Sequence, residues 1–188
     1  MAEPRLNFDN VSALVVDRDQ YSLTLTRQML RGFGLRTQYQ ARSGDEAQKF
    51  LRKTPVDLCI VEARLTDMSG YDLVHWIRRR PEEILRFMPV MLLSGYTQMR
   101  NVATSRDCGA NCIVRKPFSP KVLYDHIVWS AASKRPHLES SVYIGPDRRF
   151  HDLEDTAPAR RVTDEDAPAP DPDAAPDIAD DQLRRTRA

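Results

Sequence analysis

The feature of this sequence that most constrains its fold is a set of five short apolar runs separated by longer amphipathic segments. The intervening segments carry apolar residues at helical spacing, as between Leu23 and Leu30. Near-continuous apolar strands that alternate with helices are typical of a parallel sheet covered on both faces. The pattern therefore predicts an α/β fold with a doubly wound sheet of five parallel strands, at residues 12–16, 35–40, 58–61, 89–93 and 111–114.

Polar or charged residues follow four of these predicted strands. In a doubly wound sheet of the flavodoxin-like type, which this pattern indicates, ligands bind outside the carboxyl ends of the strands. The residues at or just beyond those ends are therefore the first candidates for a functional site. They are Asp17, Glu62, Ser94 and Lys116.

The last part of the chain differs in composition from the rest. Residues 137–188 hold seven Arg, no Lys, 13 acidic residues and six of the 13 prolines of the chain. A segment of this kind, without apolar periodicity, cannot bury enough surface to offset the entropy of ordering it. The sequence predicts an N-terminal extension at 1–10, one folded domain at 11–135 and a disordered tail at 136–188.

Composition also argues against several classes of protein. No apolar run approaches the roughly 20 residues of a membrane span, and the first residues lack the order of a signal peptide. The cysteines Cys59, Cys108 and Cys112 lack the further ligands of a zinc site. The tail has neither a helix-turn-helix pattern nor strong positive charge, which argues against DNA binding. We therefore expect a cytoplasmic protein that does not bind DNA.

A series of short motifs then points to a known family. In this order and at this spacing they resemble the receiver domain of two-component response regulators, of the CheY-like chemotaxis type. The resemblance covers about the first 135 residues. The motifs are Val15-Val16-Asp17, Gly44-Asp45-Glu46-Ala47, Val56-Asp57-Leu58, Met68-Ser69-Gly70-Tyr71-Asp72-Leu73, Pro89-Val90-Met91-Leu92-Leu93-Ser94, Gly109-Ala110 and Lys116-Pro117-Phe118.

The resemblance implies a site built for phosphoryl transfer. In the family, an Asp at the end of the third strand takes a phosphoryl group from a histidine kinase, and two acids after the first strand hold Mg²⁺. A hydroxyl after the fourth strand and a Lys before a proline grip the acyl phosphate. The cations are needed because an anionic carboxylate must approach an anionic phosphate. Asp17 matches the first acid, Ser94 the hydroxyl and Lys116 the ammonium.

Two positions depart from this pattern. Arg18 stands in place of the second acid, and Glu62 stands in place of the phosphoacceptor. Mg²⁺ is usually held by carboxylates, and the longer Glu side chain would miss the position for in-line attack. We therefore expect a pseudo-receiver that is not an enzyme and needs no metal, in which Arg18 and Lys116 neutralise Asp17, Asp19 and Glu62. The alternative is a slow phosphoacceptor that uses Asp17 and Asp19 for Mg²⁺.

The tail carries two copies of an Arg-Arg-x-x-Asp pattern, which resembles the motif by which several bacterial proteins hold cyclic-di-GMP. An Arg fork can bind guanine O6 and N7, and Tyr143 or Phe150 could stack on the base. The chain also resembles CheY-like proteins whose arginine-rich extension binds this messenger and docks on flagellar motors. A charged tail that only solvates or contacts a partner is the alternative reading. The two copies are Arg148, Arg149 and Asp152, and Arg160, Arg161 and Asp164.

The resemblance also implies a protein partner. In the family, the surface around the fourth helix, the fourth strand and the fifth strand contacts other signalling proteins. We expect Gln98, Met99 and Arg100 on or near that surface. The candidate partners are a histidine kinase, a flagellar motor or another signalling protein, and many receivers form homodimers through the same face. Protein contact rather than catalysis is thus the expected output.

Overall fold

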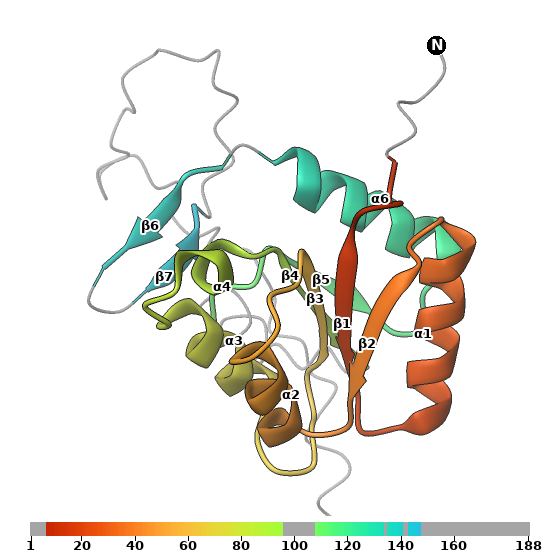
Figure 1. The fold of residues 1–188 in the computed structure, drawn as a ribbon, viewed down its shortest axis with the longest axis horizontal. Helices are drawn as coiled ribbons and strands as arrows, with labels where there is room; N and C mark the ends of the chain where they lie inside the picture. Colours follow the sequence, from red (N-terminus) through yellow and green to blue (C-terminus); the bar gives the residue numbers. More distant parts are fainter. Residues whose placement is uncertain (1–6, 96–107, 134, 141–142, 148–188) are drawn as a thin grey trace, which may run out of the picture. The chain divides into compact units, whose positions relative to one another are not determined.

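A central sheet organises the molecule. The computed structural model describes residues 7–95, 108–133, 135–140 and 143–147. Its five main strands are all parallel and lie in the order β2-β1-β3-β4-β5, which confirms the predicted doubly wound sheet (Figure 1). The strands are β1 (Ser12–Val16), β2 (Thr37–Ala41), β3 (Leu58–Glu62), β4 (Val90–Ser94) and β5 (Cys112–Arg115).

Helices cover both faces of this sheet (Figure 1). On one face, α1 (Gln20–Gly32) and α6 (Pro120–Ala132) pack in one apolar cluster. On the other face, α2 (Gly44–Leu51) and α3 (Gly70–Arg78) pack in a second cluster. Burial on both faces explains why the central strands are almost continuously apolar. No helix in the described ranges is long and apolar enough to cross a membrane.

The helix starts follow local signals in the sequence. The Asp19 side chain accepts a hydrogen bond from Ser22 N (2.7 Å) and so caps α1. Ser43 caps α2 in the same way, through Glu46 N. Ser69 and Asp72 cap each other at the start of α3 as a capping box. Each cap satisfies backbone donors that the first turn leaves without partners, and it fixes where the preceding loop ends.

The structure contains elements that the sequence pattern did not predict. One is the short helix α4 (Glu83–Phe87). The others are β6 (His137–Glu139) and β7 (Ile144–Pro146), which form an antiparallel hairpin just after α6. The hairpin lies inside the segment expected to be disordered, so ordered structure continues past the predicted boundary at residue 135 at least to Asp147.

The hairpin is joined to the sheet by Arg135 and its neighbours. Arg135 donates from Nη2 to the carbonyl of Asn111 (2.9 Å) and from Nη1 to that of Asp147 (3.2 Å). The backbone N–H of Asp147 donates to Pro136 (2.8 Å). A Cβ atom on Gly109, whose φ is +89°, would collide with the carbonyl oxygen of Ile144. Close backbone contact therefore holds the hairpin against the entry to β5.

Beneath the hairpin lies Arg78, the last residue of α3, which is fully buried. Its guanidinium donates to the carbonyls of Gly109 (2.8 Å), Arg86 (2.8 Å) and Met88 (2.7 Å), and to Asn111 Oδ1 (2.8 Å). Burial lowers the pKa of Arg78 to about 10. Because four acceptors satisfy the charge, Arg78 ties the end of α3 to α4 and to the starts of β4 and β5.

Candidate functional site

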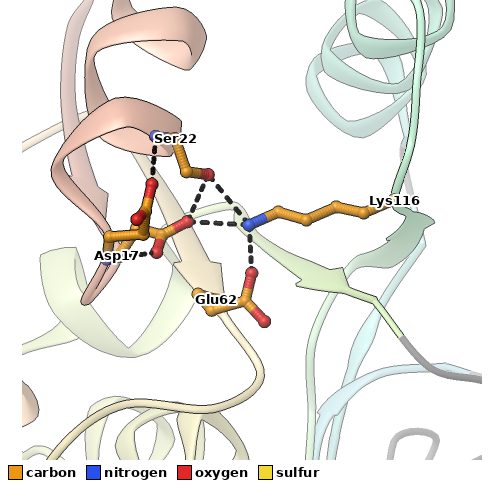
Figure 2. Close-up of polar contacts among 5 residues, drawn as sticks. Asp17, Ser22, Glu62 and Lys116 are labelled. Atoms are coloured by element: carbon orange, nitrogen blue, oxygen red, sulfur yellow. Dashed lines mark hydrogen bonds and ion pairs between the residues drawn. The ribbon is translucent and has the colours of Figure 1, made fainter.

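Three charged side chains meet at the carboxyl ends of the strands. Asp17 directly follows β1, Glu62 ends β3 and Lys116 directly follows β5. Lys116 Nζ lies 2.7 Å from Asp17 Oδ2 and also forms an ion pair with Glu62 Oε2 (Figure 2). Both carboxylates are buried, with Asp17 only 2% and Glu62 only 8% exposed. One ammonium therefore holds two buried carboxylates from neighbouring strands.

Both oxygens of Asp17 are already bound by the protein. Oδ1 accepts a hydrogen bond from the backbone N–H of Asp19 (2.9 Å). Oδ2 accepts from the hydroxyl of Ser22 (2.6 Å) as well as from Lys116. Lys116 Nζ in turn lies 3.0 Å from Ser22 Oγ, which closes a small network (Figure 2). These contacts fix the Asp17 carboxylate in place.

Ser22 was not predicted as a site residue. It lies in the first turn of α1, three residues after the cap Asp19. Helix geometry turns this position back toward the loop after β1, where its hydroxyl meets Asp17. The sequence signal that could have found it is the Asp-x-x-Ser spacing at a helix start.

The charge of Lys116 is stabilised by its neighbours. Partial burial by itself would lower the pKa of this ammonium, because burial disfavours charge. Hydrogen bonds and ion pairs with Asp17 and Glu62 outweigh burial and raise the pKa of Lys116 above its usual value of 10.5. Lys116 is therefore a fixed cation at neutral pH. The peptide bond that joins it to Pro117 is cis.

Arg18 and Asp19 do not join the pocket as expected. Both residues are exposed in the loop between β1 and α1. Asp19 uses its carboxylate to cap α1. The described part of the chain shows no ion pair between Arg18 and the pocket carboxylates. We expected both Arg18 and Lys116 to neutralise the pocket carboxylates, but the structure shows Lys116 paired with Asp17 and Glu62 while Arg18 remains exposed.

The backbone around the pocket places Ser94 and Glu62. Ser94 ends β4 and is buried, and its carbonyl accepts a hydrogen bond from Lys116 N (2.8 Å). Glu62 lies against the start of α3, where a Cβ on Gly70 would collide with the Glu62 carbonyl. The four strand-end residues predicted from the sequence therefore lie at one edge of the sheet, and Asp17, Glu62 and Lys116 are in direct contact.

Most of the tail residues predicted to bind a nucleotide lie outside the described residues, as do Gln98, Met99 and Arg100. Tyr143 is described, and it is half-buried. Its hydroxyl donates to the carbonyl of Pro146 (2.6 Å), so the side chain folds back on its own hairpin. The tail residues outside the described ranges are Arg148, Arg149, Asp152, Arg160, Arg161 and Asp164.

Comparison with known proteins identifies the family. The family described as the response regulator receiver domain matches residues 13–128. The chain belongs to this receiver family. A receiver is a signalling domain of two-component systems that interacts with signalling partners. The hairpin β6–β7 begins after the end of the family match.

Three similar proteins illustrate the relationship. The polar-differentiation response regulator DivK of Brucella ovis is 26% identical over 108 residues, which cover 57% of this chain and 85% of DivK. The response regulator protein PilR of Pseudomonas aeruginosa is 29% identical over 134 residues, 69% of this chain, but this receiver spans only 28% of PilR. The signal receiver domain of a histidine kinase from Syntrophus aciditrophicus superposes with a TM-score of 0.61 at 28% identity, covering 70% of this chain and 98% of that domain.

The receiver family implies a Mg²⁺ site beside the phosphoacceptor, and the pocket can be tested for it. Mg²⁺ requires oxygen ligands in near-octahedral arrangement. Here the Asp17 oxygens are bound by protein donors and Asp19 caps a helix. Arg18, at the position of the family's second acid, offers no oxygen ligand and is exposed in the loop. Across the described residues, no group of three or more His, Cys, Asp or Glu could hold a metal ion. The two pocket carboxylates, Asp17 and Glu62, are both paired with Lys116 in this arrangement.

Proposed function

We propose that this receiver is a pseudo-receiver, which signals by binding another protein and does not accept a phosphoryl group. The observation that carries the proposal is the double ion pair of Lys116 with Asp17 and Glu62. In this state the ammonium that should grip a phosphoryl group is already neutralised by side chains of the chain itself. The Lys116 ammonium therefore needs no bound ligand to neutralise its charge.

The electrostatics of the pocket oppose phosphoryl transfer. Two carboxylates already face one ammonium, so an incoming phosphate dianion would add to an excess of negative charge. In a partly buried site such repulsion is much stronger than in water. A divalent metal would normally offset this repulsion. Metal binding is disfavoured here because Arg18 replaces an acidic ligand and because both oxygens of Asp17 already accept hydrogen bonds from the chain.

The geometry of Glu62 opposes transfer as well. Glu is one methylene longer than Asp, so its carboxylate extends further into the pocket, where it reaches Lys116. In-line attack needs the nucleophilic oxygen at a defined distance, and a misplacement of about 1 Å can cost about 100-fold in rate. The extended carboxylate instead supplies the anion that binds Lys116. We infer that the receiver is held in one conformation and that its partner binding does not wait for a kinase.

Incubation with acetyl phosphate and Mg²⁺, followed by intact-mass measurement, tests this proposal. We expect no phosphoryl gain for the natural chain. The matched variant Glu62→Asp with Arg18→Asp restores the family residues and should gain one phosphoryl group, which shows that the conditions suffice. Arg18→Asp alone should not.

The same measurement distinguishes the alternative of a slow phosphoacceptor. If that alternative holds, the natural chain gains one phosphoryl group over hours, and the gain disappears when Mg²⁺ is chelated. Peptide mapping would then place the group on Glu62. Stoichiometric phosphorylation at Glu62 would contradict the pseudo-receiver proposal.

A second candidate function is control of this receiver by cyclic-di-GMP bound to the tail. Its support is the repeated Arg-Arg-x-x-Asp pattern at Arg148-Arg149 and Arg160-Arg161, since paired arginines suit guanine or phosphate. Calorimetry on the full chain tests it, with Arg148→Ala combined with Arg160→Ala expected to abolish binding. The matched control is Arg184→Ala with Arg185→Ala, a pair that no Asp follows at the same spacing. Absence of binding to the natural chain, or equal loss in the control, rejects the candidate.

A further inference from the structure

An open groove lies beside α4, away from the pocket of Lys116. It has a volume of about 410 Å³ and is lined by both apolar and acidic side chains. Two of its large apolar side chains remain exposed, Ile84 at 67% and Phe87 at 46%. Exposed apolar surface of this size favours an occupant, because burying one aromatic side chain is worth about 1.5–3 kcal/mol. The lining residues are Val56, Asp57, Glu83, Ile84, Phe87, Met88 and Pro89.

The hairpin brings the end of the described chain next to this groove. The His137 ring meets the Phe87 ring edge to face at 5.0 Å, and Glu139 forms an ion pair with Arg86 of α4. The backbone N–H of the last described residue, Asp147, donates a hydrogen bond to the carbonyl of Pro136, the residue just before β6. The chain therefore leaves the hairpin within a few residues of Phe87.

The residues that follow have the chemistry that the groove lacks. They are Arg148, Arg149 and Phe150. Three residues can span at most about 10 Å, and the hairpin that ends at Asp147 already touches the groove lining where His137 meets Phe87. The acidic side chains Asp57 and Glu83 line the groove and complement two arginines.

We propose that residues 148–150 dock in the α4 groove, with Phe150 on Ile84 and Phe87 and with the arginine pair beside the acidic rim. The tether makes this docking intramolecular, so even weak contacts give a high occupancy. Docking removes the first arginine pair from solution and leaves the second pair, Arg160-Arg161, accessible. It is independent of whether Glu62 accepts a phosphoryl group.

Limited trypsin digestion of the full chain tests the docking. Trypsin cleaves after Arg149 and after Arg161, and the ratio of the two rates is measured by mass spectrometry. Cleavage of a protected site tracks the population of its open form. We expect Ile84→Ser to raise the rate at Arg149 relative to Arg161 by roughly tenfold, as for a segment docked about 90% of the time. The control Val122→Ser, on exposed α6 surface, should leave the ratio unchanged.

A direct measurement complements the digestion. Nuclear Overhauser contacts between the Phe150 ring and the Ile84 methyl groups should appear in the full chain and persist on dilution. An unchanged cleavage ratio in Ile84→Ser together with absent contacts overturns the proposal. Contacts that appear only between differently labelled copies also overturn it, and they assign the groove to self-association.

Discussion

At the scale of single residues, Lys116 is the centre of the pocket. It is one cation between two buried carboxylates, and the Ser22 hydroxyl completes the set. When one partner is removed from such a group, the remaining charge is buried without a counter-charge. The resulting loss of stability exceeds the net stabilisation that the ion pair itself provides. The identity of residue 116 therefore matters for stability even in a receiver that transfers no phosphoryl group.

We predict that Lys116→Met lowers the free energy of unfolding at pH 7 by about 2–3 kcal/mol, a value below the fully buried range because Lys116 is partly exposed. Urea unfolding measures it. Since folding raises the pKa of Lys116, its stabilising contribution is present at neutral pH and is lost as the pH rises above 10.5. The difference between natural chain and variant should therefore shrink at high pH.

The matched control is Lys116→Met combined with Glu62→Gln. Because the second change removes one of the orphaned charges, the double variant should recover a good part of the loss. If Lys116→Met is as stable as the natural chain at pH 7, the ion pairs contribute nothing and the account of the pocket fails.

The sequence was sufficient to predict that Asp17, Glu62 and Lys116 meet, because parallel strands bring their carboxyl ends to one edge of the sheet. It was not sufficient to orient the loop after β1. There the Asp19 side chain could either point into the pocket or cap the following helix, and in the structure it caps α1. With Asp19 fixed as the cap, Arg18 remains exposed in the same loop.

At the scale of elements, the hairpin β6–β7 is the part that most extends the receiver. Its strands have three residues each, too short to show a period-two pattern, and it contains Gly145 and Pro146, which are typical of loops. Its order comes from tertiary contacts with Arg135, Gly109 and α4 that no local pattern encodes. The short helix α4 was missed for the same reason. The longer helices were predictable because their apolar periodicity and caps agree.

The hairpin carries a pH-sensitive residue. Burial, together with Arg78, Arg135 and Arg86, lowers the pKa of His137 to about 4 from the ordinary 6.5. The folded state therefore disfavours the proton, so stability is unaffected above pH 6.5 and falls as the pH drops from 6.5 to about 4. We predict that His137→Gln removes about 1–2 kcal/mol of this acid sensitivity, after allowance for the partial exposure of the ring.

Urea unfolding of both proteins at pH 7 and pH 4.5 measures this difference, because other titrating groups are common to the two chains. His126→Gln is a suitable control, since His126 lies half-buried on α6, where its ring Nδ1 meets the carbonyl of Val122 (2.8 Å). If the natural chain and His137→Gln lose the same stability on acidification, the hairpin does not exclude the proton from His137.

At the scale of the whole molecule, the hairpin decides where the folded receiver ends. A chain that stops at Arg135 would uncover Arg78 and Gly109 and would lose the bonds from Arg135 to Asp147. A chain that stops at Asp147 keeps all of these contacts. We predict that truncation after Asp147 lowers the free energy of unfolding by about 1.4 kcal/mol, the contribution of residues 148–150 if they are docked about 90% of the time. Truncation after Arg135 should lower it by about 2–3 kcal/mol more, because the hairpin contacts are lost as well. Urea unfolding of the two truncated chains beside the full chain measures both values. Equal stability of the two truncated chains would mean that the hairpin contacts contribute nothing to the stability of the receiver. The hairpin could then not couple the tail to β5.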